Sequence, residues 1–216
     1  MTVEAFSWEN AHCFGDALAG QHRLRHRIFI ERQNYQVPAY NGMEYDQFDT
    51  PAATYVVRRD EQGIVRAINR LIPTTTNYMI KELWPDLVEE LNELPSSPNV
   101  WEGSRIGVDD RLEPKLRDRY FGELLCGVLE FGMARGIDWY IGIMPAGIVR
   151  RAMIGAGLDV DLIGSPKTVG DTWRVQAVKI NVTAASLAEV RRRKGVEGPV
   201  LDLIGQPQPL PQRVAA

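Results

Sequence analysis

The stretch LEPKLRDRYFGELLCGVLEFGMARG, residues 112–136, constrains the fold most, because it is the clearest helix in the sequence. Pro114 suits the first turn of a helix, and Gly136 suits its C-terminal cap. The residues that follow, IDWYIGIMP (137–145), are largely apolar, as expected of a strand buried on both faces. A long helix followed directly by a buried strand indicates a sheet that is covered by helices.

Hydrophobic periodicity and turn residues predict the other elements. Helices are expected at 10–31, 146–157 and 184–194, with one or two short helices around Pro85 within 79–91. Strands are expected at 54–59, 64–72, 100–109 and 172–182. This order predicts an α/β fold with a mixed twisted sheet flanked by helices on both faces, compatible with a Gcn5-related N-acyltransferase-like α-β-α sandwich. We expect one domain over residues 1–195 and a Pro-rich C-terminal tail over 196–216.

Composition narrows the classes of function. The 216 residues carry a net charge of −3, and 44% of them are hydrophobic. We therefore expect no nucleic-acid partner and no membrane insertion. The N-terminus, MTVEAFSWEN, lacks the basic and apolar regions of a secretion signal, which predicts a cytoplasmic protein. Cys13 and Cys126 have neither metal nor CxxC spacing, so we expect buried, reduced thiols.

Histidine is scarce, and its positions exclude several kinds of site. The three histidines all lie within the first 26 residues. A Ser-His-Asp or Cys-His site would have to recruit one of them, and a His-rich zinc site is disfavoured, so we expect no metal. Any acid–base chemistry is expected to depend on carboxylates, water and backbone groups.

A strongly basic stretch, HRLRHRIFIERQ (22–33), is followed closely by an acidic one, GMEYDQFD. Arg25 and Phe29 share a helix face, where an arginine beside an aromatic ring can hold a carboxylate while the ring stacks on a planar ligand. Asp46 and Asp49 have the charge to bind an ammonium or sulfonium group. The alternative is a solvated basic helix that pairs with an acidic loop.

The strand around WEGSRIGV carries two charged residues, Glu102 and Arg105, in the middle of the chain. In a regular strand they face opposite ways unless a bulge near Gly103 redirects one of them. Buried charges are costly unless they are paired, so this pattern indicates a polar site. An edge strand with exposed charges is the alternative. Arg70 in NRLIPTT also has two interpretations. It is either a residue of this polar site or an ordinary residue at the start of a threonine-rich turn.

Together, LRHRIFIERQNY, GMEYDQFD, RLIPTT and VWEGSRIGVDD resemble the acyl-homoserine-lactone synthases, the LuxI-type autoinducer synthases of bacterial quorum sensing. The resemblance spans residues 21–180. The family motif falls on Arg25, Phe29, Tyr35, Asp46, Asp49, Arg70, Trp84, Glu102 and Arg105. Tyr35 stands where the family usually has Trp, and Trp84 where it usually has Phe, so both positions keep an aromatic ring.

The resemblance implies two substrates, S-adenosylmethionine and an acyl thioester supplied as acyl-acyl-carrier-protein or acyl-CoA, and no cofactor. The substrate amine attacks the thioester, and the methionyl carboxylate then displaces methylthioadenosine to close a lactone. A general N-acyltransferase that uses acyl-CoA and another amine is one alternative. A catalytically inactive ligand-binding regulator is another.

The resemblance also implies roles for individual residues. Glu102 is the expected base, Asp46 orients the amine, and Arg105 and Arg25 hold polar groups of the ligand. The residues that brace this network or shield the adenosyl group are Asp49, Arg70, Phe29, Tyr35 and Trp84. Glu44 is expected at the surface. The acyl chain is expected in an apolar tunnel that is lined by Leu125, Met133, Ile143 and Met144. The apolar trio MPA (144–146) offers no hydroxyl to a 3-oxo group.

Overall fold

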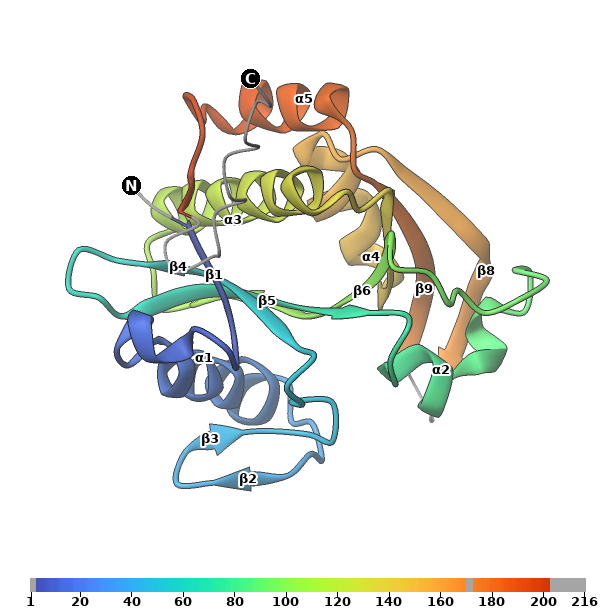
Figure 1. The fold of residues 1–216 in the computed structure, drawn as a ribbon, viewed down its shortest axis with the longest axis horizontal. Coiled ribbons are helices and arrows are strands. Elements are labelled where there is room, and N and C mark those ends of the chain that lie inside the picture. The colour runs from blue at the N-terminus through green and yellow to red at the C-terminus, as the bar shows by residue number, and fades with distance from the viewer. Residues whose placement is uncertain (1–2, 170–172, 203–216) are drawn as a thin grey trace, which may run out of the picture.

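The structure, a computed structural model, describes residues 3–169 and 173–202. Its centre is an eight-stranded sheet with the order β10-β1-β4-β5-β6-β7-β9-β8 (Figure 1). The strands are β1 (Val3–Ser7), β4 (Thr54–Arg59), β5 (Val65–Pro73), β6 (Val100–Val108), β7 (Trp139–Pro145), β8 (Val160–Val169), β9 (Trp173–Asn181) and β10 (Leu201–Asp202). A separate two-stranded hairpin is formed by β2 (Ala39–Tyr40) and β3 (Met43–Glu44).

Helices cover both faces of the sheet, and each face has its own hydrophobic core (Figure 1). The face that we call the α3 face carries α3 (Pro114–Arg135), α4 (Ala146–Ile148) with its π-helical continuation η4 (Val149–Ile154), and α5 (Ala184–Lys194). The opposite, α1 face carries η1 (Ala11–Phe14), α1 (Ala17–Arg25), the π-helical η2 (His26–Arg32), α2 (Met79–Leu83) and η3 (Pro85–Val88). The predicted mixed sheet with helices on both faces is thus confirmed. Within the described ranges, no helix combines the length and apolarity that a membrane crossing requires.

The sequence signals around α3 and β7 have the physical causes expected of them. Pro114 occupies the first turn of α3, and Gly136 caps its end in the left-handed conformation with a φ of 66°. Along β7, Tyr140 and Met144 pack in the core of the α3 face, whereas Ile141 packs in the core of the α1 face. Both faces of β7 are therefore apolar, which explains its uninterrupted apolar sequence.

Several expectations need correction. The helix predicted at 10–31 is three pieces, η1, α1 and η2, and the strands β1 and β8 were not predicted. The loop predicted at 33–50 contains the short β2–β3 hairpin. Cys13 is exposed rather than buried, although Cys126 is buried as expected. β1 has only five residues, and β8 is an edge strand with mostly exposed or half-buried residues, so neither has a strong hydrophobic pattern.

Part of the expected C-terminal tail belongs to the folded domain. β10 pairs in parallel with β1, and the side chains of Val196 and Val200 are buried in the core of the α3 face. The carboxylate of Glu130 on α3 accepts hydrogen bonds from the amides of Val200 and Leu201. The domain therefore extends past the predicted boundary at 195, and residues 203–216 lie outside the described residues.

The parallel strands β6 and β7 separate partway along their length. They pair only where Val100, Trp101 and Glu102 meet residues 139–141. Beyond Glu102, the described residues include no partner strand for β6 other than β5, and none for the matching part of β7 other than β9. A gap in the sheet therefore opens immediately after Glu102, and polar and apolar side chains gather on either side of it.

Candidate active site

Three arginines and three carboxylates form a closed, buried network on the α1 face of the sheet. This ion-pair cluster consists of Arg25 at the end of α1, Arg70 on β5, Arg105 on β6, Glu44 on β3, and Asp46 and Asp49 in the loop after β3. Every one of these side chains is at most 9% exposed. The alternative of a solvated helix paired with a solvated loop is therefore excluded.

Arg25 joins two of the carboxylates. Its Nε donates a hydrogen bond to Glu44 Oε2 at 2.5 Å, and its two Nη atoms donate to the two oxygens of Asp49 at 2.6 and 2.8 Å. Burial by itself raises the pKa of Asp49, but the hydrogen bonds and charge of Arg25 outweigh it and hold that pKa well below its usual range. Asp49 is therefore ionised, and the bidentate geometry fixes its orientation.

Arg70 and Arg105 complete the cluster. Arg70 bonds both oxygens of Asp46 at 2.5 and 3.1 Å and reaches Asp49 at 3.1 Å. Arg105 Nη2 lies 3.0 Å from Glu44 Oε1 and 2.7 Å from Asp46 Oδ2. Each carboxylate consequently contacts two arginines, and each arginine contacts two carboxylates. Such full pairing is what allows six charges to be buried together.

An irregularity in strand β6 directs the side chain of Arg105 toward the cluster. The β5–β6 register shifts between Ile68 and Arg70, so that β6 gains one residue relative to β5. Arg105 itself has a φ of +53°, which is uncommon for a residue with a side chain. Ser104, directly before it, accepts a hydrogen bond from Arg70 Nε at 3.1 Å. A bulge of the kind that would let Glu102 and Arg105 share a face therefore exists, directly after Ser104, and it brings Ser104 and Arg105 to the same face.

Glu102 lies beside the cluster but makes no ion pair with it. Its carboxylate is fully buried and accepts hydrogen bonds from the backbone amides of Met79 at 3.1 Å and Ile80 at 2.7 Å, at the start of α2. Burial raises its pKa above the ordinary value, although the two amides and the charge of Arg70 oppose that rise. The cluster and Glu102 together have three cationic and four acidic side chains, and this excess of one acidic group favours an added positive charge.

Aromatic rings border the cluster. The guanidinium of Arg105 lies over the ring of Phe29, with its carbon 5.5 Å from the ring centroid. Phe29 contacts Tyr35 at a centroid distance of 5.6 Å, and Tyr35 meets Trp173 edge-on at 4.8 Å. Trp84 is partly buried against the core of the same face. The structure therefore brings Phe29 and Tyr35 to the arginines and adds Trp173, which our sequence analysis did not single out.

Sequence reasoning missed other residues that hold the cluster in place. Glu44, expected at the surface, is fully buried between Arg25 and Arg105. Tyr55 donates its hydroxyl hydrogen to Asp49 at 2.9 Å, and His22 bonds the backbone oxygen of Glu44 at 2.8 Å. Burial and the nearby charge of Arg25 lower the pKa of His22, which favours its neutral form. The sequence did contain a signal for Glu44. GMEYDQFD has three carboxylates and the site has three arginines, so each arginine charge could have been matched by one carboxylate.

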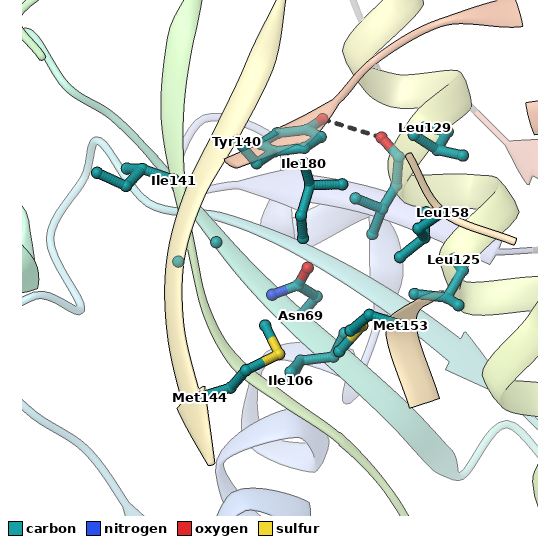
Figure 2. Close-up of a pocket in the computed structure, with 13 residues that line it drawn as sticks. Asn69, Ile106, Leu125, Leu129, Tyr140, Ile141, Met144, Met153, Leu158 and Ile180 are labelled. Atoms are coloured by element: carbon teal, nitrogen blue, oxygen red, sulfur yellow. Dashed lines mark hydrogen bonds between the residues drawn. The ribbon is translucent and has the colours of Figure 1, made fainter. Parts of the chain in front are cut away.

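A small apolar cavity lies on the other, α3 face, next to the gap between β6 and β7 (Figure 2). Its volume is about 30 Å³. Its lining includes Leu125, Val128 and Leu129 of α3, Tyr140 and Met144 of β7, Met153 of η4, Leu158, and Ile180 of β9. Leu125 and Met144 thus lie where the acyl-chain hypothesis expects them.

The structure does not bring the other two predicted tunnel residues to this cavity. Met133 is 45% exposed, so it faces solvent rather than the core. Ile143 packs against the core of the α1 face, because alternate residues of β7 point to opposite sides of the sheet. Both are corrections to the expected lining.

Comparison with known proteins identifies the family to which this chain is similar. The family model described as "Autoinducer synthase" matches residues 14–190. The isovaleryl-homoserine lactone synthase of Bradyrhizobium diazoefficiens is 30% identical over 215 residues, which cover 94% of this chain and 93% of that protein.

Solved structures agree with the sequence comparison. BjaI, a CoA-dependent acyl-homoserine lactone synthase, superposes with a TM-score of 0.82 in its structure with MTA and 0.81 in its structure with SAM and isopentyl-CoA. Both are 28% identical and cover 93% of this chain and 92% of theirs. MesI, also CoA-dependent, has a TM-score of 0.79 and 25% identity, with 92% and 98% covered. The family match over residues 14–190 and the 30% identical relative show that this chain belongs to the autoinducer synthase family.

Proposed function

We propose that this protein makes an N-acyl-homoserine lactone, a quorum-sensing signal, from S-adenosylmethionine and an acyl thioester. The α-amine of S-adenosylmethionine loses a proton and attacks the thioester carbonyl, and the thiol leaves. The methionyl carboxylate then attacks its own Cγ, breaks the carbon–sulfur bond and closes the lactone. Methylthioadenosine takes the electron pair of that bond. The supporting observation is that the ion-pair cluster with Glu102 and the apolar cavity lie on opposite faces of the sheet, beside the same gap between β6 and β7.

The ion-pair cluster has the chemistry to receive S-adenosylmethionine. A sulfonium and an ammonium both carry positive charge, which the excess carboxylate over guanidinium favours. We assign Asp46 to orienting the ammonium and Arg105 to holding the substrate carboxylate, since Arg105 follows Glu102 on β6 at the gap and contacts Asp46. Asp49 pairs with both Arg25 and Arg70, and these three residues are assigned to bracing the other two. Phe29, Tyr35 and Trp84 are assigned to shielding the adenosyl group.

Glu102 is our candidate for the general base. It is the last residue of β6 to pair with β7, so its carboxylate is next to the gap where amine and thioester would meet. Burial raises its pKa toward the range in which a carboxylate accepts a proton readily, directly or through water. Beyond Glu102, the side of β6 that faces β7 has no strand partner among the described residues. Backbone amides on this free edge are suited to stabilising the oxyanion of the tetrahedral intermediate.

We propose that the acyl chain passes through the gap into the cavity on the α3 face, where Leu125 and Met144 would contact it. Acyl-CoA is the donor we favour over acyl-acyl-carrier-protein, because BjaI and MesI are both described as CoA-dependent. A cytoplasmic location is also proposed. The two cysteines are free, one of them exposed, as in proteins of reducing compartments.

The test is a reaction with purified protein, S-adenosylmethionine and a panel of short acyl-CoA and acyl-carrier thioesters. We expect free thiol, methylthioadenosine and lactone in equal amounts, measured by thiol titration and mass spectrometry. Thiol release without consumption of S-adenosylmethionine, when another amine is supplied, would instead identify a general N-acyltransferase. Binding of S-adenosylmethionine without any product would identify a regulator.

A further inference from the structure

One polar side chain stands out in the wall of the apolar cavity. Asn69 on β5 is 5% exposed and lies among aliphatic residues (Figure 2). The other polar group in the lining is the hydroxyl of Tyr140, which donates its hydrogen to the backbone oxygen of Val128 at 2.9 Å. Burying an amide in such surroundings is costly unless its hydrogen-bonding groups are satisfied.

The amide nitrogen of Asn69 is fully used by the protein. It donates to the backbone oxygen of Ser104 at 2.8 Å and to that of Arg70 at 3.3 Å. Turning the amide over would set its oxygen against these two acceptors, so the pair of carbonyls fixes which atom faces the cavity. Figure 2 shows the oxygen on the side of the amide that faces Ile180.

The amide oxygen, in contrast, has no hydrogen-bond donor among residues 3–169 and 173–202. An unpaired acceptor in an apolar cavity is the arrangement expected of a group that awaits a donor from a ligand. An acyl chain without substituents carries no such donor. A hydroxyl group on the chain would supply one.

The position of Asn69 indicates which carbon of the acyl chain it would meet. Asn69 directly precedes Arg70, whose side chain enters the ion-pair cluster on the opposite face of the sheet. Its amide also holds Ser104, the residue between Gly103 and the bulge at Arg105. The amide oxygen is 3.8 Å from the place a Cβ on Gly103 would take, and Gly103 directly follows the candidate base Glu102, so we expect the oxygen to contact the first carbons of the chain.

We propose that Asn69 selects acyl donors that carry a hydroxyl at C3 and disfavours 3-oxo donors. The hydroxyl hydrogen would bond the amide oxygen, whereas a ketone at C3 would place one acceptor against another. This inference rests on the proposed function and on the acyl cavity assigned there. It concerns a side chain whose polar role our sequence analysis did not consider.

A purely structural role for Asn69 has to be separated from this one. Its amide nitrogen satisfies a carbonyl where the β5–β6 ladder is interrupted, so any substitution would also loosen the bulge. Loss of stability or of overall rate would not distinguish the two roles. The ratio of kcat/KM values between two donors does, because both are measured on the same folded enzyme and the active fraction cancels.

The experiment compares butyryl-CoA, 3-hydroxybutyryl-CoA and 3-oxobutyryl-CoA by methylthioadenosine release. For the wild type we expect kcat/KM to be about five- to tenfold higher for the 3-hydroxy donor than for butyryl-CoA, as one neutral hydrogen bond would give. The 3-oxo donor should be the poorest. In Asn69→Leu the preference for the hydroxyl should disappear.

Gln176→Leu provides the matched control. Gln176 is 2% exposed and also donates its amide hydrogens to backbone carbonyls, but it is not part of the cavity lining. Its loss should lower stability while leaving the donor ratio as in the wild type.

A wild-type ratio of one or less overturns the inference, as does an Asn69→Leu variant that keeps the wild-type ratio. If Asn69→Leu does not fold, the wild-type ratios and Asn69→Ala decide the question. No methylthioadenosine from these donors or from any member of the acyl-thioester panel would refute the proposed function itself, whereas turnover without the preference refutes this inference alone.

Discussion

Replacing Glu102 with glutamine separates a catalytic role from a structural one. The substitution keeps the shape of the side chain but leaves one oxygen and one NH2 group. Only one of the two backbone amides of α2, those of Met79 and Ile80, can then keep its acceptor. The other amide faces a donor, at a cost of about 1–3 kcal/mol.

This cost is too small to unfold the protein. A domain of ordinary stability has about 5–15 kcal/mol, so at the unfavourable ends of both ranges about 2 kcal/mol remains. That corresponds to roughly 97% folded protein. Loss of a general base lowers kcat/KM by about 100- to 10,000-fold. The two explanations therefore differ by orders of magnitude in their expected effect on activity.

The assay measures methylthioadenosine release for kcat/KM and urea unfolding for stability on the same preparation. Glu123→Gln is the matched control, since Glu123 is a buried carboxylate on α3 that pairs with Arg58 at 2.5 Å and Arg119 at 2.9 Å, away from the gap. It should lose at least as much stability and keep its kcat/KM. Near-wild-type activity of Glu102→Gln would remove Glu102 from the base role, and an equal loss in Glu123→Gln would show that the loss is structural.

Three further predictions concern the ion-pair cluster. Arg105→Lys keeps the charge but cannot bridge Glu44 and Asp46, so the KM for S-adenosylmethionine, measured by initial rates, should rise about tenfold or more. An unchanged KM would exclude Arg105 from substrate binding. Glu44→Gln leaves two buried arginines short of a counter-charge, so the free energy of unfolding should fall by about 3–5 kcal/mol, measured from the urea midpoint. A fall of less than about 1 kcal/mol, as for surface ion pairs, would contradict the burial of Glu44. The pKa of Asp49 is lower in the folded than in the unfolded protein, so its stabilisation is present above about pH 4 and is lost as the pH falls below that value. Unfolding free energies measured from pH 6 down to pH 3 should therefore fall less steeply in Asp49→Asn than in the wild type, and equal slopes would disprove the assignment.

The fold was predictable where local signals and burial agree. Pro114 and Gly136 mark the ends of α3 because their backbone preferences are intrinsic to the residues. Pro85 likewise separates α2 from η3. β1 and β8 were missed because their assignment depends on pairing with distant strands, which no local pattern reveals.

Five of the six members of the cluster were predictable, but Glu44 and the arrangement of the cluster were not. Charge spacing and family resemblance pointed to Arg25, Asp46 and Asp49, yet neither indicated that Glu44 is buried between two arginines. Its burial results from the way α1, β3 and β6 come together, which is tertiary information. Met133 was misplaced for a related reason, since an apolar residue on a long helix can face either the core or solvent.

The separation of β6 from β7 also bears on inhibition. The ion-pair cluster and the apolar cavity lie beside the same gap on opposite faces of the sheet, so one molecule with a cationic head and an acyl tail could contact both at once. Such a bisubstrate compound would lose translational freedom only once, and its affinity would exceed that of either half alone. The crossing is narrow, because even a Cβ on Gly142 would lie 3.2 Å from the carbonyl oxygen of Gly103. Its linker must therefore be as thin as the planar amide that the two substrates form.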